Sequence, residues 1–285
     1  MTLGRALEKR SESACFGGTL GVYAHRSAET KTDMSVSVFL PPAAALGPCP
    51  ALYYLAGLTC TQDTFVQKAG AQRLAAELGL ILVAPDTSPR GAGIAGEDTD
   101  WDFGSGAGFY LDATQAPWSA NYRMGSYVND ELPTLIGETF AIRPGAQGIM
   151  GHSMGGHGAL VSALRHPGKW LSVSALSPIC NPAAVPWGHK AFGNYLGPDQ
   201  AIWQEHDASV LMARRAFPGP VLVDQGLADQ FLEPQLRPEA LEAAAKKSGQ
   251  ALTLRRHPGY DHSYWFIQTV IADHLRHHAR ELGAG

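Results

Sequence analysis

Short apolar runs alternate with amphipathic stretches along most of this chain. Seven runs of five or six residues have the length and composition of strands. Five of these runs are nearly continuous in apolar residues, which is typical of strands covered on both faces. The predicted strands span residues 35–40, 51–56, 80–84, 147–151, 171–176, 220–224 and 252–256.

Stretches with apolar residues at helical spacing lie between and after these runs. The predicted helices span residues 69–78, 126–139, 154–165, 238–248 and 264–282. Alternating strands and helices indicate βαβ units. We therefore predict an α/β fold with a mostly parallel central sheet and helices on both faces. No linker or repeat interrupts the pattern, so we expect one domain over residues 1–285.

Residues 87–121 fit neither pattern. This segment is rich in glycine, aspartate and aromatic residues and has no periodicity. A segment of this length without regular structure is usually functional in a compact domain, so we expect it to cap or line a site. A surface loop without a role is the alternative.

Composition limits the partners of the chain. With 45% hydrophobic and 17% charged residues, the chain is of the folded globular class. The net charge of -4 leaves no basic excess for nucleic acid. Residues 35–62 carry no charge and are long enough to span a membrane, but four prolines interrupt them. We interpret this segment as two strands and a turn, and expect no membrane partner.

The four cysteines, Cys15, Cys49, Cys60 and Cys180, stand far apart and form no C-x-x-C pair. This spacing favours free thiols in a reducing compartment, with no metal site and no cofactor. The first fourteen residues lack the apolar stretch of a secretion signal. We expect a cytoplasmic protein, and we keep a homodimer as a candidate assembly.

The clearest chemical signal is Gly-His-Ser-Met-Gly at residues 151–155. This G-x-S-x-G pattern follows an apolar strand and precedes small residues that let a helix approach a sheet. In α/β-hydrolases such a strand–turn–helix exposes a nucleophilic serine, here Ser153. A serine hydroxyl is a weak nucleophile and needs a base, which an acid orients.

In that fold the acid follows the serine along the chain, and the histidine follows the acid. Asp224 and Asp229 compete for the role of the acid, because both lie at the end of the strand 220–224 or in its following loop. We favour Asp229, since its position further along the loop allows it to reach an imidazole. Asp224 is expected to end the strand and cap the turn.

His262 is the preferred base because it lies on the loop that enters the last predicted helix. His257 is the alternative, at the end of a strand, and Pro258 restricts its backbone. Three further histidines on the last helix are expected to form a solvated face: His274, His277 and His278.

An oxyanion hole needs two backbone N–H donors. Met154, directly after the nucleophile, is expected to supply one of them. The loop at residues 57–60 follows the strand 51–56, and we assign the second donor to Leu58, with Gly57 allowing the turn. An ordinary strand exit is the alternative interpretation of this loop.

Several further segments carry a family pattern. They read Leu-Thr-Cys-Thr at 58–61, Asp-Thr-Phe at 63–65, Ala-Pro-Asp-Thr-Ser-Pro-Arg-Gly at 84–91, Gly-Ala-Gly-Phe-Tyr at 106–110, Gly-His-Ser-Met-Gly-Gly-His-Gly at 151–158, Leu-Ser-Pro at 176–178, Asp-Gln-Gly at 224–226, Asp-Gln-Phe-Leu at 229–232 and Gly-Tyr-Asp-His-Ser-Tyr at 259–264. Together they closely resemble the S-formylglutathione hydrolases, also called the esterase D family, over essentially the whole chain. The resemblance implies a triad of Ser153, Asp229 and His262, and a cysteine close to the nucleophile at Cys60.

The resemblance also implies a small-molecule substrate, S-formylglutathione, which is hydrolysed to glutathione and formate in formaldehyde detoxification. Bulky aromatic residues near the site would suit a formyl group, and the candidates are Trp101, Phe103, Phe109, Tyr110 and Trp187. A cation is expected beside the carboxylates of glutathione, and the candidates are Arg90, Arg123 and Lys190. Of these residues, Trp101, Trp187 and Lys190 are the substrate-binding candidates that we carry forward.

Other functions use the same residues. A broad carboxylesterase acting on short acyl esters would have an identical triad, and an acyltransferase would differ only in its acceptor. A binding protein on an inactive hydrolase scaffold is disfavoured by the intact Ser153, Asp229 and His262.

Overall fold

The computed structural model describes residues 4–284, and the strands within them form one nine-stranded sheet in the order β1-β2-β3-β5-β4-β6-β7-β8-β9. The strands are β1 (Glu8–Cys15), β2 (Gly18–Arg26), β3 (Asp33–Leu40), β4 (Cys49–Leu55), β5 (Ile81–Pro85), β6 (Ile142–His152), β7 (Ser172–Leu176), β8 (Val221–Gly226) and β9 (Leu252–His257). From β5 to β9 every neighbouring pair is parallel, whereas β1, β2 and β3 are antiparallel to their neighbours. The predicted mostly parallel sheet is confirmed, and each predicted strand is present.

The two strands at the amino-terminal edge were not predicted. They form a hairpin whose turn, Phe16 and Gly17, has positive φ at both residues, as a two-residue hairpin turn requires. Strand β1 is exposed along almost its whole length and reads Glu-Lys-Arg-Ser-Glu-Ser-Ala-Cys. Because it buries neither face, β1 has no apolar periodicity from which a strand could be predicted.

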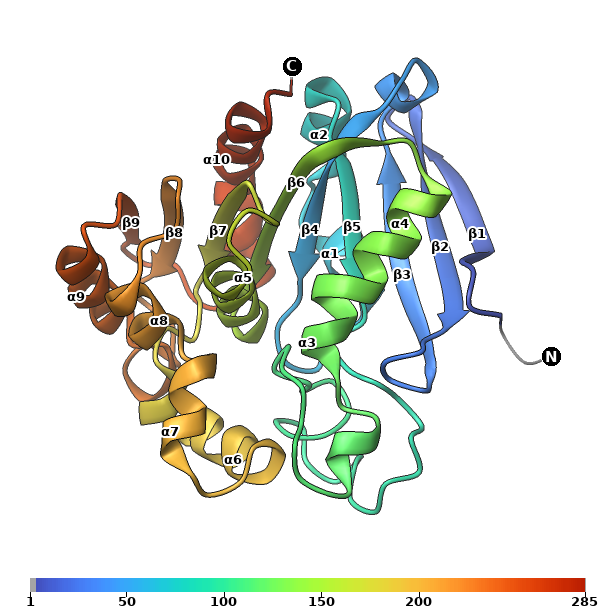
Figure 1. The fold of residues 1–285 in the computed structure, drawn as a ribbon. Helices are drawn as coiled ribbons and strands as arrows, with labels where there is room; N and C mark the ends of the chain where they lie inside the picture. Colours follow the sequence, from blue (N-terminus) through green and yellow to red (C-terminus); the bar gives the residue numbers. More distant parts are fainter. Residues whose placement is uncertain (1–3, 285) are drawn as a thin grey trace.

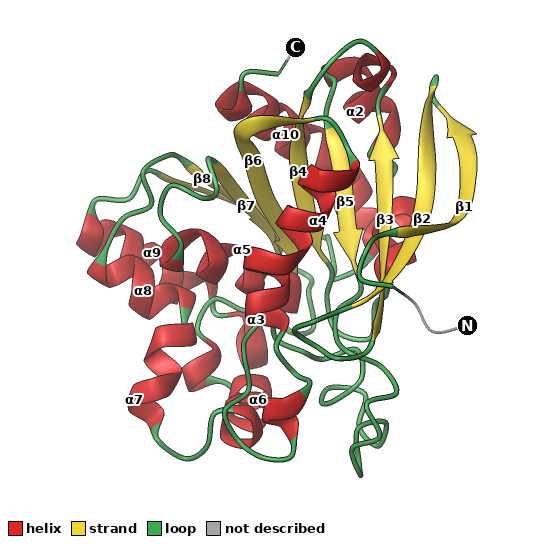
Figure 2. Cartoon of the chain, turned by 45° about the vertical axis from the view of Figure 1, so that its right-hand side comes forward, coloured by secondary structure: helices red, strands yellow, loops and turns green. Residues whose placement is uncertain are grey.

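Helices cover both faces of the sheet, as predicted (Figures 1 and 2). They are α1 (Gln62–Lys68), α2 (Gln72–Leu78), α3 (Met124–Ser126), α4 (Leu132–Thr139), α5 (Met154–Arg165), α6 (Pro186–Tyr195), α7 (Gln200–Trp203), α8 (Ala208–Arg214), α9 (Pro238–Ser248) and α10 (Tyr264–Leu282). Strand β4 is buried on both sides: Leu52 and Tyr54 belong to the core under α1, α2 and α10, and Tyr53 and Leu55 to the core under α4, α5 and α8. This alternation explains why the central strands are continuously apolar.

Some helices differ from the prediction. The helix expected at 69–78 starts only at Gln72, after Gly70 adopts a positive φ, and α1 precedes it. The helix expected at 126–139 contains a π-helical turn, Tyr127–Glu131, between α3 and α4. Helices α6, α7 and α8 were not predicted: α7 and α8 have only four and seven residues, and α6 contains two glycines and begins with a proline.

The expectation that the histidines of α10 form a solvated face is wrong. His274 and His278 are fully buried, and His277 is 5% exposed. The two serines of β7 supply partners, since Ser174 lies between His274 Nδ1 (2.8 Å) and His278 Nε2 (2.8 Å), and Ser172 bonds His278 Nδ1 (2.6 Å). Burial is therefore tolerated because hydrogen bonds satisfy the ring nitrogens.

The carboxyl ends of the parallel strands point to the lower edge of the sheet in Figure 1, where the long segment after β5 and helices α6 and α7 gather. Ligands of such sheets bind at this edge. Among residues 4–284, no helix is both long and apolar enough to cross a membrane.

Candidate active site

Ser153 occupies a sharp turn between β6 and α5. Its backbone has φ +58° and ψ −120°, a conformation that residues other than glycine rarely adopt. The turn is held by hydrogen bonds from Ser153 N to Leu176 O (2.9 Å) and from Ile179 N to Ser153 O (3.3 Å). Helix α5 then runs so close to β4 that a Cβ at Gly155 would lie 1.9 Å from Leu55 O. The predicted strand–turn–helix is confirmed, with its strained residue at Ser153.

Asp229 and His262 form a close pair. Asp229 Oδ2 lies 2.5 Å from His262 Nδ1, and the side chain of Asp229 is fully buried. The carboxylate is fixed by donors from Phe231 N to Oδ1 (2.8 Å) and from Gln225 Nε2 to Oδ2 (3.3 Å). With Nδ1 engaged, His262 has Nε2 left for a substrate or a nucleophile.

The competing candidates pair with each other instead. Asp224 Oδ1 lies 2.8 Å from His257 Nε2, and Asp224 also bonds His274 Nε2 (2.9 Å) and Arg255 Nε (2.7 Å). Burial alone would raise the pKa of Asp224, but the hydrogen bonds from Arg255 and His274 hold it below its ordinary value. Asp224 therefore joins β8, β9 and α10, while Asp229 pairs with His262.

A pocket of about 200 Å³ joins these elements. It is lined by Gly57, Leu58, Thr59, Cys60, Trp101, His152, Ser153, Trp187, Phe231 and His262. Ser153, His262, Leu58, Cys60, Trp101 and Trp187 were all predicted to lie at or near the site, and they line one cavity. The segment 87–121 contributes Trp101 to this lining, as expected of a functional segment.

One wall of the pocket is aromatic. The ring of Trp187 contacts that of Trp101 (centroids 5.7 Å apart) and that of Phe231 (4.7 Å), and Phe231 in turn packs edge-on against His262 (5.1 Å). Trp187 is 5% exposed within this wall, whereas Trp101 is 56% exposed and stands at its solvent side. The other aromatic candidates, Phe103, Phe109 and Tyr110, are at most 8% exposed and belong to the core.

Each candidate cation is paired with acids outside the pocket lining. Lys190 Nζ lies 2.8 Å from Asp100 Oδ2 and 2.5 Å from Asp102 Oδ1, so it fixes the two acids that flank Trp101. Arg90 and Arg123 are paired in the same way, with Asp86 (2.8 Å) and Glu29 (2.9 Å). Lys190 does not line the pocket, and its ion pairs hold the residues on either side of Trp101.

Two lining residues were missed by sequence reasoning. Phe231 lies two residues after Asp229, and this proximity could have suggested it. His152 is the unspecified residue of G-x-S-x-G, so no signal pointed to its role. Its ring lies 4.5 Å from that of His262, and burial, with the nearby His262, lowers the pKa of His152 far below its ordinary value. His152 is therefore a neutral ring against the imidazole of His262.

The geometry leaves backbone donors free next to Ser153. Within residues 4–284, Leu58 N–H has no hydrogen-bond partner. Met154 is the first residue of α5, where N–H groups lack an acceptor within the helix. A Cβ at Gly57 would lie 3.1 Å from Ser153 Cβ, so the absence of a side chain there brings this loop against the nucleophile. Among residues 4–284, no three His, Cys, Asp or Glu side chains are arranged so that they could hold a metal ion.

Comparisons with known proteins agree with this geometry. The family model described as "Putative esterase" matches residues 27–277. An S-formylglutathione hydrolase from Mus musculus is 53% identical over 283 residues, which are 98% of this chain and 100% of that protein. One from Paracoccus denitrificans is 52% identical over 99% of this chain and 100% of that protein. The chain belongs to the S-formylglutathione hydrolase family.

A solved member of the S-formylglutathione hydrolase family has the same fold. The structure of an S-formylglutathione hydrolase from Agrobacterium tumefaciens matches with a TM-score of 0.94 at 48% identity. The match covers 97% of this chain and 100% of that one. The predicted α/β-hydrolase fold and the predicted family resemblance are thereby confirmed.

Proposed function

We propose that this chain hydrolyses the thioester S-formylglutathione to glutathione and formate. The observation that carries this proposal is one pocket lined by the strained Ser153, by His262, which pairs with Asp229, and by Leu58, whose N–H has no partner within residues 4–284. The choice of substrate rests on the curated relatives, which carry this activity in their names at about half identity.

The first half of the reaction forms an acyl-enzyme. His262 Nε2 takes the proton of Ser153 Oγ as Oγ attacks the formyl carbon, and the charge on His262 is stabilised by Asp229. The N–H groups of Leu58 and Met154 stabilise the oxyanion of the tetrahedral intermediate. Collapse of the intermediate breaks the carbon–sulfur bond, and the proton on His262 Nε2 passes to the departing sulfur, which leaves the imidazole neutral for the second half. The glutathione thiolate leaves readily, because a thiol is far more acidic than an alcohol or amine.

The second half consumes water. His262 Nε2 takes a proton from a water molecule, whose oxygen attacks the formyl ester on Ser153. The same two N–H groups stabilise the second oxyanion, and formate leaves as His262 returns a proton to Ser153 Oγ. The pocket of about 200 Å³ and its wall of Trp101, Trp187 and Phe231 suit a small acyl group.

A second activity, hydrolysis of short-chain carboxylic esters, is favoured by one specific observation. The pocket lining contains no Lys or Arg, so the walls next to Ser153 do not demand a charged substrate. Acyl transfer to an alcohol would use the same acyl-enzyme. A cytoplasmic location and a homodimer stay predictions within this proposal.

The test compares kcat/KM for S-formylglutathione with that for S-acetylglutathione and for p-nitrophenyl formate, acetate and butyrate. We expect each formyl substrate to be preferred by at least about tenfold over the acetyl or butyryl substrate with the same leaving group, since a small acyl pocket discriminates by acyl size. Equal or higher kcat/KM for the butyrate ester would contradict the proposal and favour the carboxylesterase. With a low concentration of added methanol, a transferase would give mainly methyl formate, whereas a hydrolase would still give mainly formate.

A further inference from the structure

The loop that carries Leu58 has a strained backbone. Residues 57–60, the oxyanion loop, form a turn closed by a hydrogen bond from Cys60 N to Gly57 O (3.3 Å). Thr59 within this turn has φ +67°, a conformation that a β-branched residue rarely adopts. A backbone in this state persists only where its surroundings impose it. Contacts from outside the loop must therefore fix the direction of Leu58 N–H.

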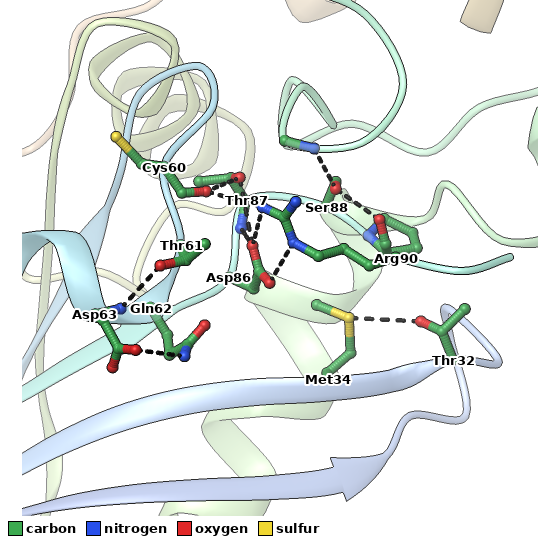
Figure 3. Close-up of polar contacts among 12 residues, drawn as sticks. Thr32, Met34, Cys60, Thr61, Gln62, Asp63, Asp86, Thr87, Ser88 and Arg90 are labelled. Atoms are coloured by element: carbon green, nitrogen blue, oxygen red, sulfur yellow. Dashed lines mark hydrogen bonds and ion pairs between the residues drawn. The ribbon is translucent and has the colours of Figure 1, made fainter. Parts of the chain in front are cut away.

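Those contacts come from the long segment after β5 (Figure 3). Thr59 N donates to Gly106 O (3.0 Å). The carbonyl of Cys60 accepts two hydrogen bonds, from Thr87 Oγ1 (2.7 Å) and from Arg90 Nη2 (3.1 Å). The loop is thus held on both sides of Thr59, and the charged donor at its end is Arg90.

Arg90 is itself fixed on the sheet. Its Nε donates to Asp86 Oδ2 (2.8 Å) and its Nη2 to Asp86 Oδ1 (3.0 Å), a bidentate geometry that a planar guanidinium favours. The hydrogen bond to Asp86 raises the pKa of Arg90, while burial acts in the opposite direction. Asp86 directly follows β5, and Asp86 N donates to Ser35 O of β3 (3.0 Å). A continuous polar connection therefore runs from the sheet through Asp86 and Arg90 to the Cys60 carbonyl.

We propose that Arg90 is a positioning residue for the oxyanion hole: through the Cys60 carbonyl it holds the oxyanion loop so that Leu58 N–H points at the developing oxyanion. This proposal rests on the proposed function, since it assigns Leu58 N–H to the oxyanion. Without Arg90, the Cys60 carbonyl loses its charged donor and the turn at Thr59 relaxes. The effect appears mainly in the transition state, because only there does the oxygen carry full charge.

The experiment removes the guanidinium and measures the oxyanion hole separately from substrate binding. The variants Arg90→Gln and Arg90→Lys are compared with the control Arg123→Gln. In the wild type, the side chain of Arg123 is exposed to a similar extent as that of Arg90 (36% against 39%) and is also paired with an acid, but it does not contact the oxyanion loop. Values of kcat and KM are measured with p-nitrophenyl acetate and with S-formylglutathione. The inhibition constant of a trifluoromethyl ketone, which forms an oxyanion on Ser153, is measured on the same proteins.

We expect Arg90→Gln to lower kcat by about 10- to 100-fold, less than the loss of an entire oxyanion donor, with KM changed by less than about twofold. The trifluoromethyl ketone should bind more weakly by a similar factor. Arg90→Lys should lie between Arg90→Gln and wild type, because an ammonium cannot bridge Asp86 and Cys60 bidentately. Arg123→Gln should match the wild type.

Three results would overturn the proposal. A raised KM with unchanged kcat would mean that Arg90 binds the substrate directly. Unchanged affinity for the trifluoromethyl ketone would mean a purely structural role, as would a loss of kcat that disappears when kcat is calculated per folded molecule. If Arg90→Gln does not fold, Thr87→Val removes the other donor to the same carbonyl and should lower kcat and inhibitor affinity together. If the wild type hydrolyses the ester but not S-formylglutathione, the proposed function is contradicted but the proposal for Arg90 is not. The measurements with the ester and the inhibitor would then still decide the role of Arg90.

Discussion

Exchanging each acid at the end of β8 for its amide should separate catalysis from stability. In Asp229→Asn, the amide retains the shape of the side chain, but it can donate to His262 Nδ1 and so favour the wrong tautomer. Such a change lowers kcat by about 10⁴-fold in serine hydrolases with this arrangement, a barrier increase of about 5 kcal/mol. Because the hydrogen bond from Phe231 N to the same side chain is retained, we expect little change in the melting temperature.

Asp224→Asn should have the opposite profile. Removing one partner from a buried ionic cluster costs about 3–5 kcal/mol. About a third of the Arg255 side chain is exposed and can be solvated, so we expect the lower end, about 3 kcal/mol. With an unfolding entropy of about 2.1 cal/mol/K per residue, a chain of 285 residues loses about 5 °C in melting temperature. Folded Asp224→Asn should retain kcat within about threefold.

The assay pairs two measurements on the same preparations. Circular dichroism gives the melting temperature, and thioester hydrolysis gives kcat per folded molecule at a temperature well below both transitions. If Asp224→Asn folds normally but its kcat falls further than that of Asp229→Asn, the assignment of Asp229 as the catalytic acid is refuted. A large drop in melting temperature for Asp229→Asn with intact kcat would refute it equally.

Three further outcomes follow. Ser153→Ala should abolish nearly all turnover with an unchanged circular dichroism spectrum, and turnover within tenfold of wild type would exclude Ser153 as nucleophile. Iodoacetamide should inhibit the wild type and Cys15→Ala but not Cys60→Ala, which should itself be active. Inhibition should be slower near neutral pH than at higher pH, because burial raises the pKa of Cys60. Equal inhibition of all three proteins would exclude Cys60 as the site of modification. Burial lowers the pKa of His157 to about 3 and that of His206 to about 4 in the folded protein. In the unfolded chain, the pKa of a histidine is about 6.5. Between about pH 4 and 6.5 the unfolded chain therefore binds more protons than the folded protein. Stability should fall on acidification through that window by up to about 1.4 kcal/mol per pH unit per histidine; thermal melts at pH 7.5 and 5 test this, and a slope undiminished in His206→Asn would contradict it.

The candidate catalytic residues have local signals in the sequence. Ser153 lies in a five-residue motif, and its turn depends mostly on the small residues beside it. The choice of Asp229 over Asp224 is a matter of side-chain direction along a strand: Val223 faces the α5 side of the sheet, so Asp224 faces α10. The loop position of Asp229 frees it from this alternation. Its 2.5 Å contact with His262 was therefore predictable without coordinates.

The sequence predicts burial poorly where polar groups satisfy one another. His274 and His278 look solvent-exposed on a helix that carries many charges, and the serines that bond them lie about 100 residues earlier in β7. A single polar residue in a strand gives no indication of its partner. Such pairs are visible only when the topology brings β7 beneath α10. The same limit applies to β1, whose exposed pattern matches a loop as well as a strand.

The candidate oxyanion hole combines a local sequence signal with contacts that the sequence does not reveal. The loop at 57–60 could be assigned from its place after a buried strand, whereas the residues that hold it lie in the aperiodic segment that pattern analysis describes least. Arg90 was considered only as a cation for the substrate, yet its guanidinium is used by Asp86 and the Cys60 carbonyl. A residue that orients a backbone carbonyl leaves no periodic or motif signal in the sequence, because its partner is an atom that every residue carries. Residues of this kind in aperiodic segments therefore have to be found from the hydrogen bonds that their side chains make.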